Sequence, residues 1–187
     1  MTTATLRTER TILRPWRADD LPPFAELNAD PEVMRHFPAT LDRAQSDAVA
    51  SRIIDHMAKY GFGFWALEIP HRMPFAGFVG LAQVPFEAPF TPAVEIGWRL
   101  ARPAWGHGYV SEAARACVRF AFDDLRLDEI VAFTVPANAR SRAVMERIGM
   151  QRDLADDFDH PRLPEGHPLR RHVLYRLCTA TKQEGTG

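Results

Sequence analysis

The stretch that decides the fold covers residues 94–115 and reads VEIGWRLARPAWGHGYVSEAAR. Its first seven residues alternate between apolar and other side chains, which predicts a strand. One face of this strand would carry Val94, Ile96, Trp98 and Leu100, and the other Glu95, Gly97 and Arg99. Pro103 ends the strand because its nitrogen has no hydrogen to donate to a neighbouring strand.

The second half of this stretch predicts a glycine turn followed by a helix. Gly106 and Gly108 flank His107, and apolar residues then recur at helical spacing: Val110, Ala113, Ala114, Cys117, Val118, Ala121 and Leu125. A helix N-terminus presents free N–H groups and the positive end of the helix dipole, which suits a phosphate or pyrophosphate. Glycines between a strand and a helix can also form only a tight connection, so both interpretations stay open at this point.

A second stretch, residues 135–150, decides between these interpretations. It reads VPANARSRAVMERIGM and follows the apolar segment IVAFTV, which predicts a strand that Pro136 ends. Asn138 and Ser141 then open a short helix, and Gly149 closes it. The two stretches together give a glycine-turn helix, a strand and a second helix that opens with N-x-x-S.

This arrangement resembles the acetyl-CoA site of the GNAT N-acetyltransferase superfamily. Three further segments are similar to the branch of the RimJ/RimL-type ribosomal-protein N-acetyltransferases: TERTILRPW (8–16), NADPEV (28–33) and WGHGYVSEA (105–113). The resemblance extends over residues 6–177. It implies an α+β GNAT fold, a central, mixed, mostly antiparallel twisted sheet of about six or seven strands flanked by about four helices. Residues 1–179 would form a single domain, and residues 180–187 a disordered tail.

The resemblance also implies a binding site for acetyl-CoA as the acyl donor. The pyrophosphate would lie on the glycine turn and the start of the helix, formed by Trp105, Gly106, His107, Gly108, Tyr109, Val110 and Ser111. Asn138 would contact the pantetheine arm, with Ser141 in the same site. The amides of that arm would pair with the strand edge at Trp98 and Leu100, as an added strand does. Trp105 and Val110 depart from the superfamily pattern, which begins with Gln or Arg and ends with Gly or Ala.

In this superfamily the amine attacks the thioester directly in a ternary complex, without an acyl-enzyme, and a base must first deprotonate it. A primary amine has a pKa near 10 and is mostly protonated at neutral pH. Glu95 is the best placed carboxylate, and Glu68 and Glu87 are lesser candidates. The alternative role of Glu95 is a structural salt bridge to Arg99 or Arg14.

The general acid is a second open question. Many superfamily members have a tyrosine at the position that Met145 occupies here. Ser141 is the replacement that the RimL-like branch suggests, and a thiolate leaving group with a pKa of about 8.5 needs little help. The alternative role of Ser141 is to cap the helix that follows it.

The amine acceptor is not defined by the sequence. A protein N-terminus and a small-molecule amine present the same reacting atom. Phe86 and Phe90 would line the acceptor pocket with Glu95, or they would simply pack on the core. The acidic, proline-rich loop at 153–171 would cover the acceptor, or be only a solvated loop. Its Asp and His residues match no tetrahedral metal pattern, so no metal is expected.

The composition excludes several classes of protein. With 187 residues, 46% of them hydrophobic, the chain suits one globular domain. A formal net charge of −1 argues against broad electrostatic binding of nucleic acid. Cys117 and Cys178 make no disulfide framework. The sequence has no apolar segment long enough for a signal peptide or a membrane span, so a cytoplasmic protein is expected.

Two other functions compete with the N-acetyltransferase. A dinucleotide-binding oxidoreductase would use Gly106 and Gly108 with Asp128 or Glu129, but Ser111 stands where its third glycine belongs. A non-catalytic CoA-binding or interaction module would keep the fold without the chemistry. Dimerisation is common in the RimJ/RimL-type branch, and a homodimer stays open because no interface is evident.

Caps predict two helices in the first third of the chain. Asp19 and Asp20 precede a helix at 21–28, and Asp42 with Gln45 matches a capping box. The second helix would run to about Tyr60 and end at Gly61. Its predicted apolar face consists of Val49, Ile53, Ile54 and Met57.

The remaining elements are strands. Two apolar runs at 62–69 and 75–83 predict an antiparallel hairpin, and residues 172–178 predict a closing strand. The strand–helix–strand order from Val94 to Val135 implies one parallel pairing in an otherwise antiparallel sheet.

Overall fold

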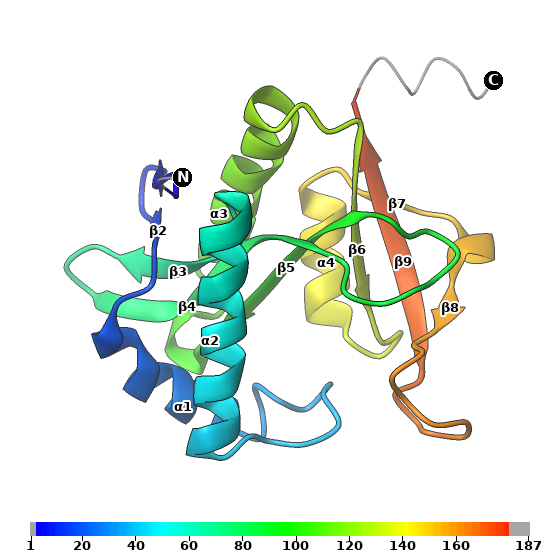
Figure 1. Cartoon of the computed structure of the whole chain (residues 1–187), viewed down its shortest axis with the longest axis horizontal. Coiled ribbons are helices and arrows are strands. Elements are labelled where there is room, and N and C mark those ends of the chain that lie inside the picture. Colours follow the sequence, from blue (N-terminus) through cyan, green and yellow to red (C-terminus); the bar gives the residue numbers. More distant parts are fainter. Residues whose placement is uncertain (1–2, 180–187) are drawn as a thin grey trace.

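A computed structural model describes residues 3–179 of the chain, which form a mixed sheet with helices on both faces (Figure 1). The strands are β1 (Leu6–Arg7), β2 (Ile12–Arg14), β3 (Phe64–Ile69), β4 (Met73–Gln83), β5 (Val94–Leu100), β6 (Glu129–Thr134), β7 (Gln151–Arg152), β8 (Phe158–Asp159) and β9 (Arg171–Cys178). Their order is β1-β2-β3-β4-β5-β6-β9-β7, and β8 pairs with β9. The fold class is as predicted, and the two-residue strands β1, β7 and β8 account for the higher strand count. The predicted tail at 180–187 lies outside the described residues.

The helices follow the predicted order. They are α1 (Leu21–Ala29), α2 (Arg43–Tyr60), α3 (Tyr109–Arg119) and α4 (Ala139–Arg147). Short 3-10 turns span Ala18–Asp20, Arg102–Ala104 and Leu154–Asp156, and a π-helical turn spans Phe120–Asp124. The apolar stripe that predicts a single helix to Leu125 therefore covers α3 and this π-helical turn.

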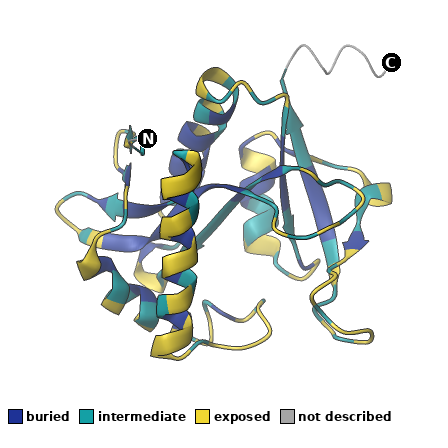
Figure 2. Cartoon of the chain, in the orientation of Figure 1, coloured by how far each residue is buried: buried dark blue, intermediate teal, exposed yellow. Residues whose placement is uncertain are grey.

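The predicted boundaries of α2 are confirmed. Asp42 Oδ1 accepts a hydrogen bond from Gln45 N at 2.8 Å, and Gln45 Oε1 accepts one from Asp42 N at 3.0 Å. Gly61 ends the helix in the left-handed region with φ of 77°. The assignment of Ile54 to the apolar face is wrong, because this side chain is 41% exposed. The buried stripe consists of Ser46, Ala50, Ile53 and Met57, and the exposed face of α2 is visible in Figure 2.

The predicted cap of α1 is wrong in its chemistry. Asp20 occupies the N-cap position, but its carboxylate makes no capping hydrogen bond to the helix. It instead accepts hydrogen bonds from Arg17 N and from the Arg14 guanidinium. The local pattern therefore predicts the helix correctly, but the Asp20 carboxylate binds Arg14 of β2 instead of capping the helix.

Helices α1 and α3 cover opposite faces of the sheet. Phe78 on β4 lies 6.0 Å, centroid to centroid, from Phe24 of α1. Trp65 pairs in register with Val79, the next residue of β4, and its ring lies 5.4 Å from Phe120 at the end of α3. Because successive side chains of a strand point to opposite faces, the sheet has an α1 face and an α3 face.

The one parallel pairing lies in the middle of the sheet, as predicted. Strands β5 and β6 pair in register only at Glu95 and Val131, whereas β4 and β5 are antiparallel along their length. The edge of β5 from Gly97 to Leu100 therefore has no pairing with β6. The main core fills both faces, and a small second cluster surrounds Val131, Phe158 and Leu174.

Candidate active site

The turn before α3 presents a row of unpaired backbone N–H groups. Gly106 and Gly108 have φ of 79° and 80°, a backbone conformation that strongly favours glycine. The first bond into α3 runs from Glu112 N to Gly108 O at 3.1 Å, so the three preceding N–H groups have no helical acceptor. Within residues 3–179, no acceptor faces any N–H group of residues 106–111. These groups suit the pyrophosphate of a nucleotide-like ligand.

Arg10 holds this turn in place, a role that the sequence does not reveal. Its Nε lies 2.7 Å from Glu112 Oε2, and its Nη1 donates to His107 O at 3.1 Å. Thr8 Oγ1 donates to the other oxygen of Glu112 at 2.5 Å. These partners are about a hundred residues apart in the chain, so no local pattern could have paired them. The His107 side chain is exposed.

Trp105 lies between the turn and β5. Its indole Nε1 donates to Leu100 O at 2.9 Å, and the guanidinium of Arg140 lies 4.4 Å from its ring centroid. Tyr109 is buried at the start of α3, and its hydroxyl accepts a hydrogen bond from Arg72 at 3.3 Å.

At the predicted pantetheine edge, the backbone groups of alternate residues of β5 point away from β4. Ala101 N donates to Ala76 O at 2.9 Å, so Ala101 and Arg99 direct their backbone groups toward β4. The alternation places the N–H and C=O groups of Trp98 and Leu100 on the opposite edge, where β6 has separated from β5. Trp105 Nε1 already donates to the Leu100 carbonyl. The backbone groups of Trp98 and the N–H group of Leu100 are left to pair with an extended ligand.

Asn138, and not Ser141, caps α4. Asn138 Oδ1 accepts a hydrogen bond from Ser141 N at 3.3 Å, and its Nδ2 donates to Thr134 Oγ1 at 2.9 Å. The alternative role of Ser141 as the helix cap is therefore wrong, and its hydroxyl makes no hydrogen bond to the described residues. Met145, at the usual tyrosine position, is buried in the core with 2% exposure.

Glu95 is a half-buried carboxylate without a partner. It shares a sheet face with its parallel neighbour Val131, which packs in the second cluster. No described residue forms an ion pair or hydrogen bond with Glu95; Arg14 binds Asp20, and Arg99 binds Asn28. Its alternative role as a structural salt bridge is thus wrong. Burial raises the pKa of Glu95 to about 7, with a small opposing effect from Arg162.

Phe86 and Phe90 belong to the aromatic cluster beside Glu95. Their ring centroids lie 6.3 Å apart, and Phe90 lies 4.8 Å from Phe158. Both side chains are half-buried and contact the second core cluster, so packing is at least one of their roles. A shallow depression lies along residues 84–92, and Arg162 donates to Pro85 O at 2.5 Å from the loop above it.

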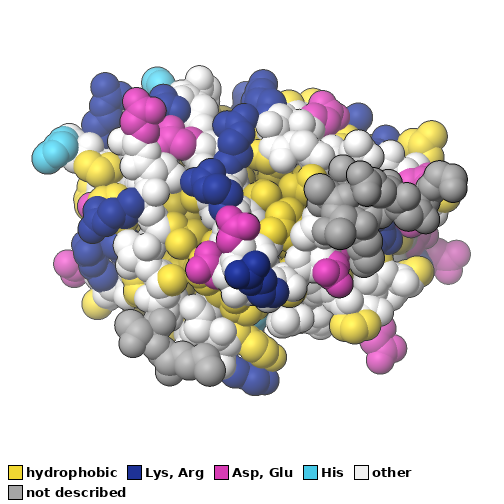
Figure 3. All heavy atoms as spheres, turned by 90° about the horizontal axis from the view of Figure 1, so that it is seen from above, with side chains coloured by type: hydrophobic (Ala, Val, Ile, Leu, Met, Phe, Trp, Pro, Cys, Tyr) yellow, Lys and Arg dark blue, Asp and Glu magenta, His cyan; other side chains and the backbone are white. Residues whose placement is uncertain are grey.

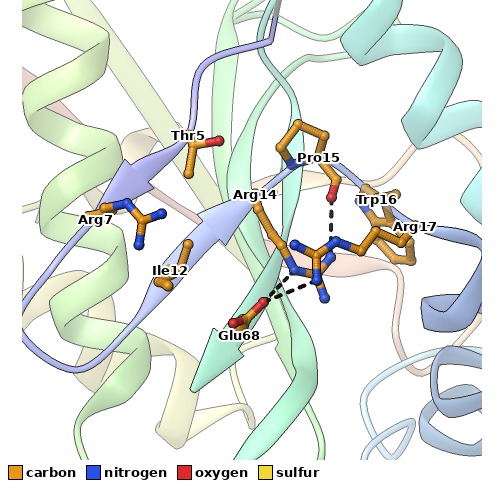
Figure 4. A pocket seen from close by; sticks show the side chains of 8 residues that line it. All are labelled: Thr5, Arg7, Ile12, Arg14, Pro15, Trp16, Arg17 and Glu68. Carbon is orange, nitrogen blue, oxygen red and sulfur yellow. Dashed lines mark hydrogen bonds and ion pairs between the residues drawn. The ribbon is translucent and has the colours of Figure 1, made fainter. Parts of the chain in front are cut away.

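The two lesser candidates for the base are poorly placed. Glu68 lies on β3 and accepts a hydrogen bond from Arg14 Nε at 2.7 Å, with Arg17 Nη1 at 3.6 Å. It lines a pocket of about 330 Å³ on the β2–β3 side of the sheet, two strands away from β5 (Figure 4). Glu87 is exposed in the loop before β5.

The acidic loop after β7 is engaged in ion pairs. Asp156 lies 2.6 Å from Arg176, Asp157 pairs with Arg152, and Asp159 lies 3.4 Å from Arg171. Among residues 3–179, no group of three or more His, Cys, Asp or Glu side chains is placed to hold a metal ion.

Two histidines of this region join the aromatic cluster. The rings of His160 and His172 lie 5.0 Å apart. Burial lowers the pKa of His160 to about 4, with smaller effects from His172 and Arg162, so this side chain is neutral at pH 7.

Charges of both signs are mixed on the surface. Figure 3 shows one face on which basic and acidic side chains are interspersed, with apolar side chains between them. Of the helices in the described range, none combines the length and the apolar character that crossing a bilayer requires.

The fold is a mostly antiparallel sheet whose one parallel pair, β5 and β6, separates after a single pairing, and a glycine turn follows β5 and opens α3. The chain belongs to the acetyltransferase (GNAT) domain family, whose match covers residues 10–151. The family uses acetyl-CoA, and the chain is therefore an acetyltransferase by family. The oxidoreductase alternative is wrong, since the sheet has one parallel pair where a doubly wound fold has many.

Three known proteins illustrate the similarity. The chain is 36% identical over 155 residues to FsC-acetyl coenzyme A-N(2)-transacetylase of Aspergillus fumigatus, a match that covers 78% of this chain and 64% of that protein. The chain thus spans less than two thirds of that relative. The acetyltransferase from Agrobacterium tumefaciens is 29% identical, with a TM-score of 0.76 and 96% of each chain covered. Mycobacterium smegmatis RimJ in complex with CoA-disulfide is 21% identical, with a TM-score of 0.72 and coverage of 97% and 88%. At 21% identity, the likeness to RimJ shows a shared fold.

Proposed function

We propose that this protein is an N-acetyltransferase that moves the acetyl group of acetyl-CoA directly to a primary amine in a ternary complex. The observation that carries the proposal is Glu95, a carboxylate without an ion pair beside the point where β5 and β6 separate. A structural acid in a folded protein is normally paired, and an unpaired acid in such a place is a candidate general base.

The donor would bind along the two sets of unpaired backbone groups. The N–H groups of residues 106–111 would hold the pyrophosphate, and the free edge of β5 at Trp98 and Leu100 would pair with the pantetheine amides. Trp105, Tyr109 and Asn138 would position these elements, each through a hydrogen bond that is already formed. Bound acetyl-CoA supplies the acetyl thioester.

Glu95 would accept the proton that the acceptor amine must lose. A base with a pKa of about 7 is largely ionised above neutral pH. Because its pKa lies near the operating pH, it can accept a proton from the amine, directly or through one water. Of the two lesser candidates, Glu68 is paired with Arg14 and lies two strands away from β5, and Glu87 is exposed. Glu95 is therefore the side chain that we assign as general base.

Ser141 would donate a proton to the departing thiolate. Its hydroxyl is free of the capping role, since Asn138 caps α4. A water could replace it, because a thiolate is a good leaving group. Phe86 and Phe90 would border the acceptor beside Glu95, and the acceptor itself is either a protein N-terminus or a small molecule.

The first experiment is a calorimetric titration of the purified protein with acetyl-CoA, with NADH as the control ligand. Binding of acetyl-CoA alone is expected, and a survey of primary amines with detection of the released thiol then tests catalysis. Failure to bind acetyl-CoA would refute the proposal. Binding without turnover of any amine would favour the non-catalytic module of the same fold.

A glycine substitution tests the turn directly. Gly108→Val is expected to abolish acetyl-CoA binding, because a β-branched residue is strained at φ of 80° and would distort the row of N–H groups. Gly166→Val is the matched control, since Gly166 has φ of 76° and lies in the loop before β9. Equal loss of affinity in both variants, measured by calorimetry, would show that backbone strain and not the turn is responsible.

A further inference from the structure

Arg99 lies on β5 on the same face as Glu95. It pairs in register with Phe78, which packs against α1, so its side chain points to the α1 face of the sheet. Its Nη1 donates to Asn28 Oδ1 at 2.6 Å. The guanidinium carbon lies 4.1 Å from the ring centroid of Phe37, in the segment between α1 and α2 (Figure 1).

Arg99 has no counter-ion. No carboxylate among the described residues forms an ion pair with it, and the nearest polar partner, Asn28, is a neutral amide with 0% exposure. Asn28 is itself held by Ser46, whose Oγ accepts from Asn28 Nδ2 at 2.9 Å. Burial lowers the pKa of Arg99 to about 10. A cation that is largely removed from water without a compensating anion is costly, so folds normally pair it.

The unpaired atoms of Arg99 share one edge of the guanidinium. A guanidinium has five N–H donors, and in Arg99 only Nη1 has an acceptor. Nε is out of contact with solvent and has no hydrogen-bond partner, and Nη2 donates to no described residue. Phe37 covers one face of the plane and Asn28 binds the far nitrogen. The Nε–Nη2 edge that is left over is a pair of parallel donors that fits a carboxylate bidentately.

The spacing along β5 sets the length of the ligand. Glu95 and Arg99 are four residues apart on one strand face, which places their Cα atoms about 13 Å apart. An extended peptide spans about 3.3–3.6 Å per residue, so about four residues bridge this distance. A free amino acid, with its amine and carboxylate on the same carbon, is too short to reach both groups.

We propose that Arg99 binds an anionic group of the acceptor, and that the acceptor is an elongated primary amine with a carboxylate at its far end. This inference rests on the proposed function, because it takes Glu95 as the point where the amine reacts. Arg99 is a specificity residue in this scheme: it holds the carboxylate, and the reacting nitrogen lies at the other end of the ligand.

The test compares two amidated tetrapeptides that differ in one side chain. Both have a free N-terminus and three alanines, and the last residue is Glu in one and Gln in the other. The wild type is expected to acetylate the Glu peptide with a kcat/KM about tenfold or more above that of the Gln peptide, mainly through KM. In Arg99→Gln this preference disappears, while acetyl-CoA affinity and the rate with the Gln peptide stay unchanged.

Arg102→Gln provides the matched control. Arg102 is an exposed arginine on the same side of the fold and lies 3.7 Å from Asp30. This variant is expected to keep the preference for the Glu peptide. Alanine and alaninamide form a second pair, which no carboxylate preference should separate because alanine is too short.

Three outcomes overturn the inference. They are equal rates with both peptides in the wild type, an undiminished preference in Arg99→Gln, and the same loss in Arg102→Gln as in Arg99→Gln. Failure of both peptides while another amine is acetylated would also overturn it and would leave the proposed function intact. Failure of every amine would refute the proposed function, and the inference with it.

Discussion

Two arginines of the sheet, the buried Arg14 and the half-buried Arg99, both face α1, and their surroundings are opposite. Arg14 is 4% exposed and binds both oxygens of Asp20 at 2.8 Å, with Glu68 on its Nε. These carboxylates raise the pKa of Arg14. Arg99 binds one neutral amide, and burial lowers its pKa to about 10.

The same contrast separates two glutamates. Glu68 accepts from Arg14 on the β2–β3 side of the sheet, whereas Glu95 has no partner on β5. Arg14 and Glu68 at the β2–β3 side are paired with each other, whereas Glu95 and Arg99 on β5 form no ion pair with the described residues. Removing one partner of a buried ion pair is destabilising because the other charge stays behind unpaired, whereas a charge that the protein leaves unpaired is available to a ligand.

The largest expected effect is on the paired side. Asp20→Ala should lower the free energy of unfolding by about 3 kcal/mol or more, because it leaves Arg14 buried with one of its two carboxylates removed. Urea denaturation monitored by tryptophan fluorescence measures this change. The neighbouring, exposed Asp19→Ala is the control and should change little. A loss below about 1 kcal/mol for Asp20→Ala would remove the contrast between the two sides.

The second effect concerns the unpaired glutamate. Only ionised Glu95 can accept a proton, so kcat should fall about tenfold per pH unit below its pKa of about 7. Glu95→Gln should reduce kcat at pH 8 by at least about a hundredfold and remove the inflection near pH 7, with acetyl-CoA affinity unchanged. The exposed Glu87→Gln serves as control. An inflection that persists in Glu95→Gln would assign the base elsewhere.

The smallest effect is the stability of Arg99→Gln. This substitution removes one hydrogen bond and two cation–π contacts, to Phe37 and Phe78, but no ion pair, so the free energy of unfolding should change by no more than about 1 kcal/mol. The same urea titration measures it beside Asp20→Ala. A loss as large as that of Asp20→Ala would mean that Arg99 is as structural as Arg14.

The sequence predicts features that depend on neighbours in the chain. The alternation before Pro103, the glycine turn before Tyr109 and the capping box at Asp42 are local patterns, and each forms the expected element. Ile54 shows the limit of such patterns, because a shift of one residue around a helix moves a side chain from core to solvent.

Partners distant in sequence could not be predicted. The sequence offered Arg99 or Arg14 as the salt-bridge partner of Glu95, and the fold pairs Glu95 with neither. Asn28, the partner of Arg99, is 71 residues away. Charge partners across a sheet depend on register and on which helix covers which face, and neither can be read from a list of residues.

Arg10 connects the beginning of the chain to the turn before α3, since it contacts both His107 O and Glu112. When two sites are coupled, each changes the stability or affinity of the other by the same free energy. If the hairpin of β1 and β2 orders the turn, then a ligand on the turn orders the hairpin to the same degree. The N-terminal hairpin is in this sense a remote part of the donor site, and its protection from proteases would report on the occupancy of a turn that lies about a hundred residues further along the chain.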